Sequence, residues 1–166
     1  MLELGHTVVV LQSLILIAVA NGGPVLFARL LGTRFAARID GGVVLGDGHP
    51  LLGRSKTWRG LVAAIVLAAF TAVLIGLPWQ AGALIGASAM AGDCLSSFVK
   101  RRLALEPSSM ALGLDQVPES LLPAVASGVF LRLAFSDIVA IVLVFSLGEL
   151  AISRLFYAVG LRDRPY

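Results

Sequence analysis

The sequence predicts an all-α integral membrane protein with five membrane-spanning helices. Of its 166 residues, 58% are hydrophobic and 14% are charged, whereas soluble domains are about 45–50% apolar and about 25% charged. The mean hydropathy is +0.93, so a small core in water would leave too much apolar surface exposed. Five apolar stretches, each close to the roughly 20 residues that cross a bilayer, are separated by polar segments.

The predicted spans follow one another in a single membrane domain over residues 1–166. The first stretch is interrupted at Asn21 to Pro24, which predicts a broken helix, and such breaks are tolerated where the freed backbone faces protein or a polar cavity. The second and third are joined by Pro78-Trp79-Gln80, which is typical of a helical hairpin. The fourth is short and contains Pro118 and Pro123. The spans are residues 7–31, 61–77, 81–99, 117–133 and 138–158.

The distribution of Lys and Arg predicts the orientation, because cytoplasmic loops carry an excess of positive charge. Of the 13 basic residues, only Arg132 lies on the side of the short connections. We therefore expect the N-terminus outside, the C-terminus in the cytoplasm, and loops 32–59 and 100–116 on the cytoplasmic face of the cell membrane. This topology explains the net charge of +3, so no nucleic acid partner is inferred.

Polar residues inside the spans point to a site, since an ionisable group there costs about 2.5–3.5 kcal/mol. Asp93, Ser97 and Lys100 fall at positions i, i+4 and i+7, on one face of a helix. The alternative is that Asp93 pairs with an ordinary basic flank. Glu149 is equally costly, and both a structural pair with Arg29 or Arg154 and a catalytic role stay open.

The first inner loop offers groups that bind phosphate. Gly53-Arg54-Ser55-Lys56-Thr57 combines backbone N–H groups with cations. The segment from Gly48 to Ser55 nearly matches the phosphate-binding P-loop, but Arg54 replaces the lysine and no strand precedes it, so that motif is rejected.

Together, these segments resemble the CDP-archaeol synthase family of membrane cytidylyltransferases, which is more distantly similar to CDP-diacylglycerol synthases. The resemblance covers residues 21–123 and includes motifs on both inner loops in the order of the family. The motifs are Asn21-Gly22-Gly23-Pro24-Val25, Ile39-Asp40-Gly41-Gly42, Ser55-Lys56-Thr57-Trp58-Arg59-Gly60, the segment from Gly92-Asp93 through Ser97 to Lys100-Arg101-Arg102, and Leu114-Asp115-Gln116.

The resemblance implies transfer of CMP from CTP to a lipid phosphate, which gives a CDP-lipid and pyrophosphate. The family substrate is 2,3-bis-O-geranylgeranyl-sn-glycerol 1-phosphate. The family mechanism assigns Mg²⁺ to acids at the positions of Asp93 and Asp115.

The remaining site residues are expected to bind the two anionic substrates. Catalysis is expected from Asp93, Asp115 and Lys100, with Asp40 as a further acid. Asn21 and Pro24 lie at the helix break, where the lipid headgroup is expected. The groups expected to hold the triphosphate are Lys56, Thr57, Arg59, Ser97, Lys100 and Arg101.

Two alternatives stay open. The same chemistry can act on a diacylglycerol phosphate or a polyprenyl phosphate, because the charged motifs do not distinguish between lipids with different hydrocarbon tails. The second alternative is a non-catalytic scaffold or transport subunit. A transporter, however, should place polar groups on both faces of the membrane. The partners expected are CTP, a membrane lipid phosphate and the bilayer, and an oligomer is compatible with the sequence.

Overall fold

A computed structural model describes residues 2–105, 111 and 113–158. Every regular element in the described part of the chain is a helix, which confirms the all-α prediction. Three of the helices, α1, α3 and α5, are long and apolar enough to cross a membrane, and α2 is a shorter apolar helix. The helices are α1 (Leu2–Leu31), α2 (Trp58–Leu74), α3 (Trp79–Arg102), α4 (Gln116–Leu131) and α5 (Phe135–Ala158).

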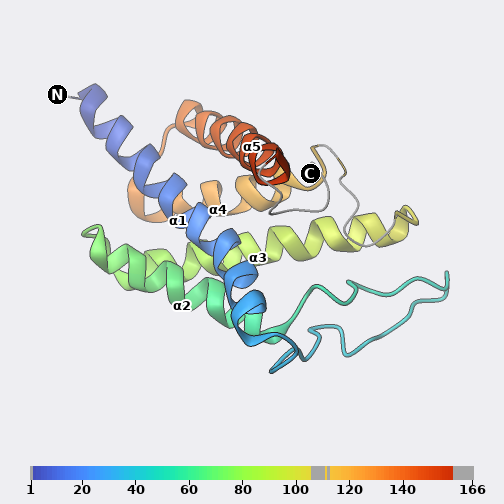
Figure 1. The fold of residues 1–166 in the computed structure, drawn as a ribbon. Coiled ribbons are helices and arrows are strands. Elements are labelled where there is room, and N and C mark those ends of the chain that lie inside the picture. Colours follow the sequence, from blue (N-terminus) through green and yellow to red (C-terminus); the bar gives the residue numbers. More distant parts are fainter. Residues whose placement is uncertain (1, 106–110, 112, 159–166) are drawn as a thin grey trace.

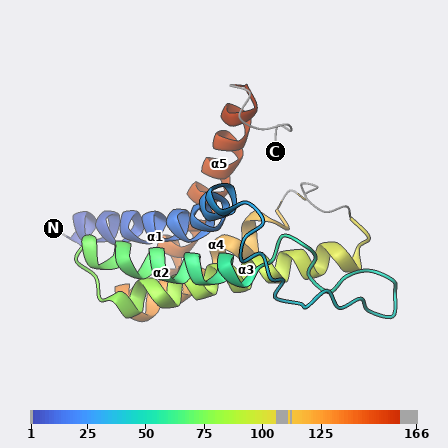
Figure 2. The ribbon, with the colours of Figure 1, turned by 60° about the horizontal axis from the view of Figure 1, so that its bottom comes forward.

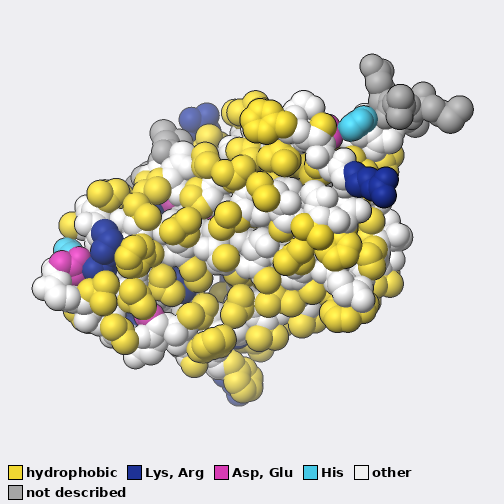
Figure 3. Space-filling model, turned by 180° about the vertical axis from the view of Figure 1, so that it is seen from behind, with side chains coloured by type: hydrophobic (Ala, Val, Ile, Leu, Met, Phe, Trp, Pro, Cys, Tyr) yellow, Lys and Arg dark blue, Asp and Glu magenta, His cyan; other side chains and the backbone are white. Residues whose placement is uncertain are grey.

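The helices pack around α3. It contacts α2 on one side and α4 on another, while α1 lies along α2. Figures 1 and 2 show α2 and α3 running side by side; α1 crosses them obliquely in Figure 1, and α5 stands across the other helices in Figure 2. Hydrophobic side chains cover most of the face in Figure 3, and most charged side chains on that face gather toward one end. A belt of this kind suits a protein surrounded by hydrocarbon.

Glycines set the close approach of the helices. A Cβ on Gly82 would lie 2.1 Å from the Ala68 carbonyl oxygen, and one on Gly92 would lie 2.1 Å from the Pro118 oxygen. Small residues drive helix packing in membranes because they let backbones approach. Gly82 therefore allows α2 to pack closely against α3, and Gly92 allows the start of α4 to do the same.

The expected break in the first helix is wrong, because α1 is helical without interruption through Pro24. Proline removes one backbone hydrogen bond and commonly bends a helix, and Figure 2 shows the last turns of α1 inclined to the rest. Packing holds the bent helix in place. A Cβ on Gly23 would meet the Leu67 side chain at 2.7 Å, and a Cβ on Gly60 would lie 3.4 Å from Pro24.

Several predicted boundaries shift. The second helix begins at Trp58, three residues before the predicted start, and α3 continues to Arg102. Lys100 and Arg101 are therefore helical and do not belong to a loop, and their charges suit the negative end of the helix dipole. Residues 106–110 and 112 of the second inner loop lie outside the described residues, as do Arg162 and Arg164, which entered the orientation argument.

The first inner loop, residues 32–57, has an ordered but irregular path. Antiparallel bridges join Arg38 to Thr57 and Val44 to Pro50, so the loop doubles back on itself. Its tip contacts the end of α3, where the Arg102 guanidinium donates to Asp47 at 2.5 Å and to the Pro50 carbonyl oxygen at 2.7 Å. The loop is thus held against the helices that carry Asp93.

Candidate active site

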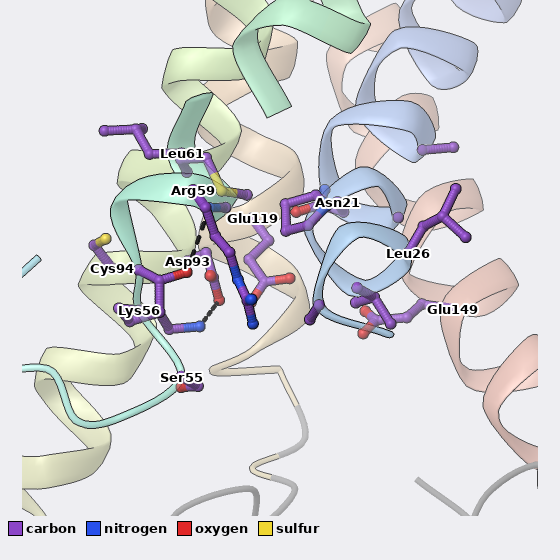
Figure 4. A pocket seen from close by; sticks show the side chains of 18 of the residues that line it. Asn21, Leu26, Ser55, Lys56, Arg59, Leu61, Asp93, Cys94, Glu119 and Glu149 are labelled. Carbon is purple, nitrogen blue, oxygen red and sulfur yellow. Dashed lines mark hydrogen bonds and ion pairs between the residues drawn. The ribbon is translucent and has the colours of Figure 1, made fainter. Parts of the chain in front are cut away.

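A cavity of about 890 Å³ lies where all five helices and the first inner loop meet. Figure 4 shows Lys56, Arg59, Asp93 and Glu119 directed toward one another, with Asn21 and Glu149 on neighbouring walls. Six of the eleven predicted site residues line this cavity. They are Asn21, Pro24, Lys56, Thr57, Arg59 and Asp93.

The central contact is an ion pair between the Lys56 ammonium and the Asp93 carboxylate. The lysine comes from the end of the loop and the aspartate from α3, and their side chains are 14% and 22% exposed. Each charge therefore has a partner in a largely dehydrated setting, where electrostatic interactions are stronger than in water. The alternative that Asp93 pairs with the basic flank after span three is therefore wrong, because its partner is Lys56 from the first inner loop.

The start of α2 faces the same cavity. Thr57 is its N-cap, and the Thr57 hydroxyl oxygen accepts from the Gly60 N–H at 3.3 Å. Arg59 lies in the first turn and donates to the carbonyl oxygens of Gly32 and Arg34, at 2.7 and 2.6 Å. Backbone N–H groups and a positive dipole at a helix N-terminus favour anions, so this wall suits phosphate.

Asp115 and Lys100 form a second ion pair. The Lys100 ammonium lies 2.9 and 3.1 Å from the two carboxylate oxygens of Asp115, and one of these oxygens also accepts from the Ala111 N–H at 3.0 Å. Neither residue is among those that line the cavity. The structure thus joins the two predicted residues to each other and sets this pair apart from the pair at Asp93.

Asp40 organises the inner loop. Its carboxylate oxygens accept from the backbone N–H groups of Gly42, Leu52 and Gly53, at 2.9 to 3.0 Å. Burial raises the pKa of Asp40, but these three donors and the nearby Arg38 outweigh burial and hold the pKa below its ordinary value of 3.8. Asp40 is therefore a charged residue whose hydrogen bonds fix the path of the loop from Gly41 to Gly53.

The other predicted residues of α3 lie outside the cavity lining. Ser97 is half-buried and Arg101 is buried. The Arg101 side chain passes close to Gly53, where an added Cβ would lie 4.0 Å from the arginine Cδ. The buried Ser96, which was not predicted, donates to the Gly92 carbonyl oxygen at 3.0 Å.

Glu119 on α4 is a cavity residue that the sequence analysis missed. Its carboxyl group lies close enough to Asp93, and to Glu149 on α5, to interact with both electrostatically. Glu119 is an ionisable residue in a predicted span, and the cost of such a group in a bilayer is the signal that identifies it.

The side-chain amide of Asn21 uses one of its polar groups in a hydrogen bond within α1. Its side-chain amide donates to the Ile17 carbonyl oxygen one turn earlier, at 3.1 Å. The amide oxygen still has its acceptor capacity. Asn21 therefore presents a polar atom on an otherwise apolar stretch of the cavity wall.

Comparison with known proteins gives the family. A model described as "CarS-like: CDP-archaeol synthase" matches residues 78–166, which is more than half of the chain. The chain belongs to the CDP-archaeol synthase family. This membership confirms the resemblance and the prediction of a CTP-dependent cytidylyltransferase that forms a CDP-lipid.

Individual members of the CDP-archaeol synthase family are similar over most of the chain. One, from Thermofilum pendens, is 30% identical over 154 residues, which cover 89% of this chain and 76% of that protein. Another, from Hyperthermus butylicus, is 41% identical over 104 residues, or 59% of each chain.

A solved structure has the same fold. It is described as an intramembrane enzyme for archaeal membrane lipids biosynthesis, has a TM-score of 0.74 and 30% identity, and is matched over 85% of this chain and 90% of its own. Together with the long apolar helices, it supports a multi-pass membrane protein.

Proposed function

We propose that this enzyme transfers CMP from CTP to 2,3-bis-O-geranylgeranyl-sn-glycerol 1-phosphate on the cytoplasmic face of the cell membrane. The observation that carries the proposal is the meeting of the Lys56–Asp93 pair with the N-terminus of α2 in a cavity whose remaining lining is mostly apolar. One end of such a cavity suits a nucleoside triphosphate, and the rest suits a lipid.

CTP is proposed to bind at the start of α2. Lys56 and Arg59 supply positive charge, and the Thr57 hydroxyl, whose oxygen accepts from Gly60, still has its proton to donate. Charge-assisted bonds from these groups to phosphate are stronger than neutral hydrogen bonds. Lys100, Arg101 and Ser97 at the end of α3 are proposed to bind the far phosphates.

Mg²⁺ is proposed to be held by Asp93 and Asp115. The chemistry of the two acids fits, because Mg²⁺ uses one or two carboxylates plus substrate phosphates and does not need a full protein cage, while in the structure Asp93 pairs with Lys56 and Asp115 with Lys100. Among the described residues no group of three or more His, Cys, Asp or Glu side chains is arranged to hold a metal. When bound, the ion would neutralise phosphate charge and polarise the phosphorus under attack.

The reaction needs no general base from the protein. The lipid phosphate is already ionised at neutral pH, and one of its oxygens attacks the α-phosphorus of CTP. A new P–O bond forms as the bond from that phosphorus to the bridging oxygen breaks, and pyrophosphate leaves with its electron pair. Lys100 and Arg101 are proposed to stabilise the charge that develops on the leaving group, and the remaining work is positioning.

The test is direct. The purified protein in nanodiscs receives radiolabelled CTP, Mg²⁺ and a panel of the ether phosphate, a diacylglycerol phosphate and a polyprenyl phosphate. We expect a labelled CDP-lipid with the ether phosphate, and loss of the product when EDTA removes the metal. Equal or better use of another lipid would replace the proposed substrate, and no product with any of the three would sink the proposed activity.

The cytoplasmic location has its own test. Single cysteines placed in the first inner loop, in a Cys94→Ala background, are treated in intact cells with a thiol reagent that does not cross membranes. We expect no labelling until the cells are opened. Labelling of intact cells would reverse the proposed orientation.

A further inference from the structure

The two helices that flank α3 are short for a membrane protein. α2 has 17 residues and α4 has 16, so at about 1.5 Å per residue each is about 25 Å long. The hydrocarbon core of a typical bilayer is about 30 Å thick. The longer helices are inclined, since α1 crosses α2 and α3 obliquely in Figure 1 and α5 stands across the other helices in Figure 2. A long helix fits a thin bilayer by tilting.

Two close contacts give the register of α2 against α3. A Cβ on Gly82 would lie 2.1 Å from the Ala68 carbonyl oxygen, and a Cβ on Gly86 would lie 2.8 Å from the Ala64 carbonyl oxygen. A step forward along α3 is therefore matched by a step back along α2, so the two helices are antiparallel. Because the backbones touch at both positions, residues of one helix can be compared in height with residues of the other.

Continued to both ends of the pair, the register defines two levels. It sets Asp93 level with the start of α2, which agrees with the ion pair between Asp93 and Lys56. It sets Trp79 level with Thr71, about 20 Å along the helix axes from Trp58. We call the level of Asp93 and Trp58 the Asp93 plane, and the level of Trp79 the Trp79 plane.

α4 fits between the same two planes. A Cβ on Gly92 would lie 2.1 Å from the Pro118 carbonyl oxygen, so the start of α4 lies at the Asp93 plane. α3 and α4 run in opposite directions in Figure 1. Leu131, the last residue of α4, follows Pro118 by as many residues as Trp79 precedes Gly92. α4 therefore ends at the Trp79 plane, and three helices agree on the separation of the planes.

The residues at the two planes are of the kinds found where a bilayer meets water. Trp58 and Trp79 are 52% and 58% exposed, and they are the two tryptophans of the sequence. Tryptophan is enriched at membrane interfaces because its ring is apolar and its N–H needs a polar partner. Arg132 follows the end of α4 at the Trp79 plane and is also exposed. An arginine near the end of a span extends its guanidinium into the headgroups.

The surface of α2 between the planes is apolar. Every exposed side chain of α2 in this interval is hydrophobic. These side chains are Val62, Val66 and Phe70, and their four-residue spacing places them on one face of the helix. Past the Asp93 plane, α3 continues to Arg102 with three basic residues in its last turn. The apolar surface therefore ends where the charges begin, about 20 Å from the Trp79 plane.

We propose that this enzyme fits a thin bilayer, with a hydrocarbon core of about 20–25 Å between headgroups at the Asp93 plane and the Trp79 plane. A bilayer of ordinary thickness must thin around the protein or extend over the polar residues at one plane, and either change costs free energy. A further consequence rests on the proposed function. In a thin bilayer the headgroup phosphates lie level with the Lys56–Asp93 pair, so the lipid phosphate reaches the nucleotide without leaving its own depth.

Depth-dependent fluorescence quenching measures the planes directly. Trp79→Phe leaves Trp58 as the one indole of the protein, and Trp58→Phe leaves Trp79. Each variant is placed in vesicles of dimyristoleoyl phosphatidylcholine that contain lipids brominated at known depths. We expect bromines near the headgroups to quench both indoles most strongly. Strongest quenching by bromines at the bilayer centre, or no quenching at any depth, would overturn the proposal.

Val66→Trp is the matched control, in a background that carries Trp58→Phe and Trp79→Phe. Val66 is 57% exposed and lies between the planes, so we expect the deepest bromines to quench its replacement most strongly. Retained helix content in circular dichroism shows that each variant is folded. One common depth profile for residue 66 and for both native tryptophans would mean that the planes are not interfaces, which contradicts the proposal.

Bilayer thickness tests the consequence for catalysis. Wild-type enzyme is placed in vesicles of phosphatidylcholine with myristoleoyl, oleoyl or erucoyl chains, which form bilayers of increasing thickness. We expect the KM for the lipid phosphate, measured as a mole fraction, to rise about fivefold from the thinnest to the thickest bilayer. The KM for CTP should stay within about twofold, because CTP arrives from water. A lipid KM that is equal in all three bilayers, or lowest in the thickest, would contradict the proposal.

The depth measurement does not need turnover. If the wild-type protein makes no CDP-lipid in any of the three bilayers, the proposed function fails. The quenching depths then still decide whether the protein fits a thin bilayer.

Discussion

Lys100 and Asp115 join the end of α3 to the start of α4 through an ion pair in which the ammonium lies 2.9 and 3.1 Å from the two carboxylate oxygens. Their side chains are only 11% and 19% exposed. Removing one member of such a pair leaves a buried charge without compensation, whereas removing both does not. Stability and activity at this position can therefore be separated.

Asp115→Asn should lower the unfolding free energy by about 3 kcal/mol and reduce turnover by roughly 100-fold or more. The double variant Lys100→Met/Asp115→Leu should recover the thermal stability while staying inactive. Melting curves and CDP-lipid formation measure the two effects. Full activity in Asp115→Asn would remove Asp115 from the proposed metal site.

Asp93→Asn should abolish turnover, because it removes the carboxylate proposed for Mg²⁺ and the partner of Lys56. Asp47→Asn is the matched control. Asp47 also pairs with a basic residue, Arg102, but it is 40% exposed, and exposed pairs contribute about 0–1 kcal/mol. Rates at saturating CTP should differ by orders of magnitude between the variants, and similar rates would count against a catalytic Asp93.

Glu119→Gln should keep the packing of α4 but replace the carboxyl group beside Asp93 with an amide. Loss of a partner that orients a metal-binding carboxylate costs about 10- to 100-fold in affinity or activity. We therefore expect the Mg²⁺ concentration for half-maximal rate to rise about tenfold, with the KM for lipid phosphate unchanged. An unaltered Mg²⁺ dependence would restrict Glu119 to a structural role.

Asp40→Asn should loosen the inner loop, because an amide NH₂ cannot accept the backbone N–H bonds that the carboxylate accepts. Faster hydrogen–deuterium exchange of the Leu52 and Gly53 amides, compared with wild type at each pH, measures the effect. Since the folded pKa lies below 3.8, the contribution of Asp40 is fully present above that pH and is lost as the pH falls through the lowered pKa. Exchange rates of wild type and Asp40→Asn should therefore converge in acid, and equal rates at neutral pH would contradict this role of Asp40.

Gly92→Ala should destabilise the protein by about 1–3 kcal/mol, because its Cβ would lie 2.1 Å from the Pro118 carbonyl oxygen. Gly128→Ala on α4 meets no atom within 4 Å and should be stabilising by up to about 1 kcal/mol through helix propensity. Thermal unfolding in detergent compares the two. Equal melting temperatures would mean that α3 and α4 do not depend on this close approach.

The sequence by itself determined the membrane class, the five helices and the residue types of the site. The bilayer selects each segment separately for its apolar length and its flanking charge. These features can therefore be predicted from the local sequence of each segment. The family motifs also named the Lys56 and Asp93 positions, because both lie in contiguous patterns.

Tertiary packing decided the rest. Pro24 bends α1 without breaking it, and α2 packs against the bend, with Leu67 beside Gly23 and Gly60 beside Pro24. The pairing of Lys56 with Asp93, 37 residues later, depends on how closely Gly82 lets α2 approach α3. The position of Glu119 beside Asp93 depends on Gly92, which allows the same close approach of α4. No local pattern encodes such distances, since they arise from the contact of helix surfaces that are separate in the sequence.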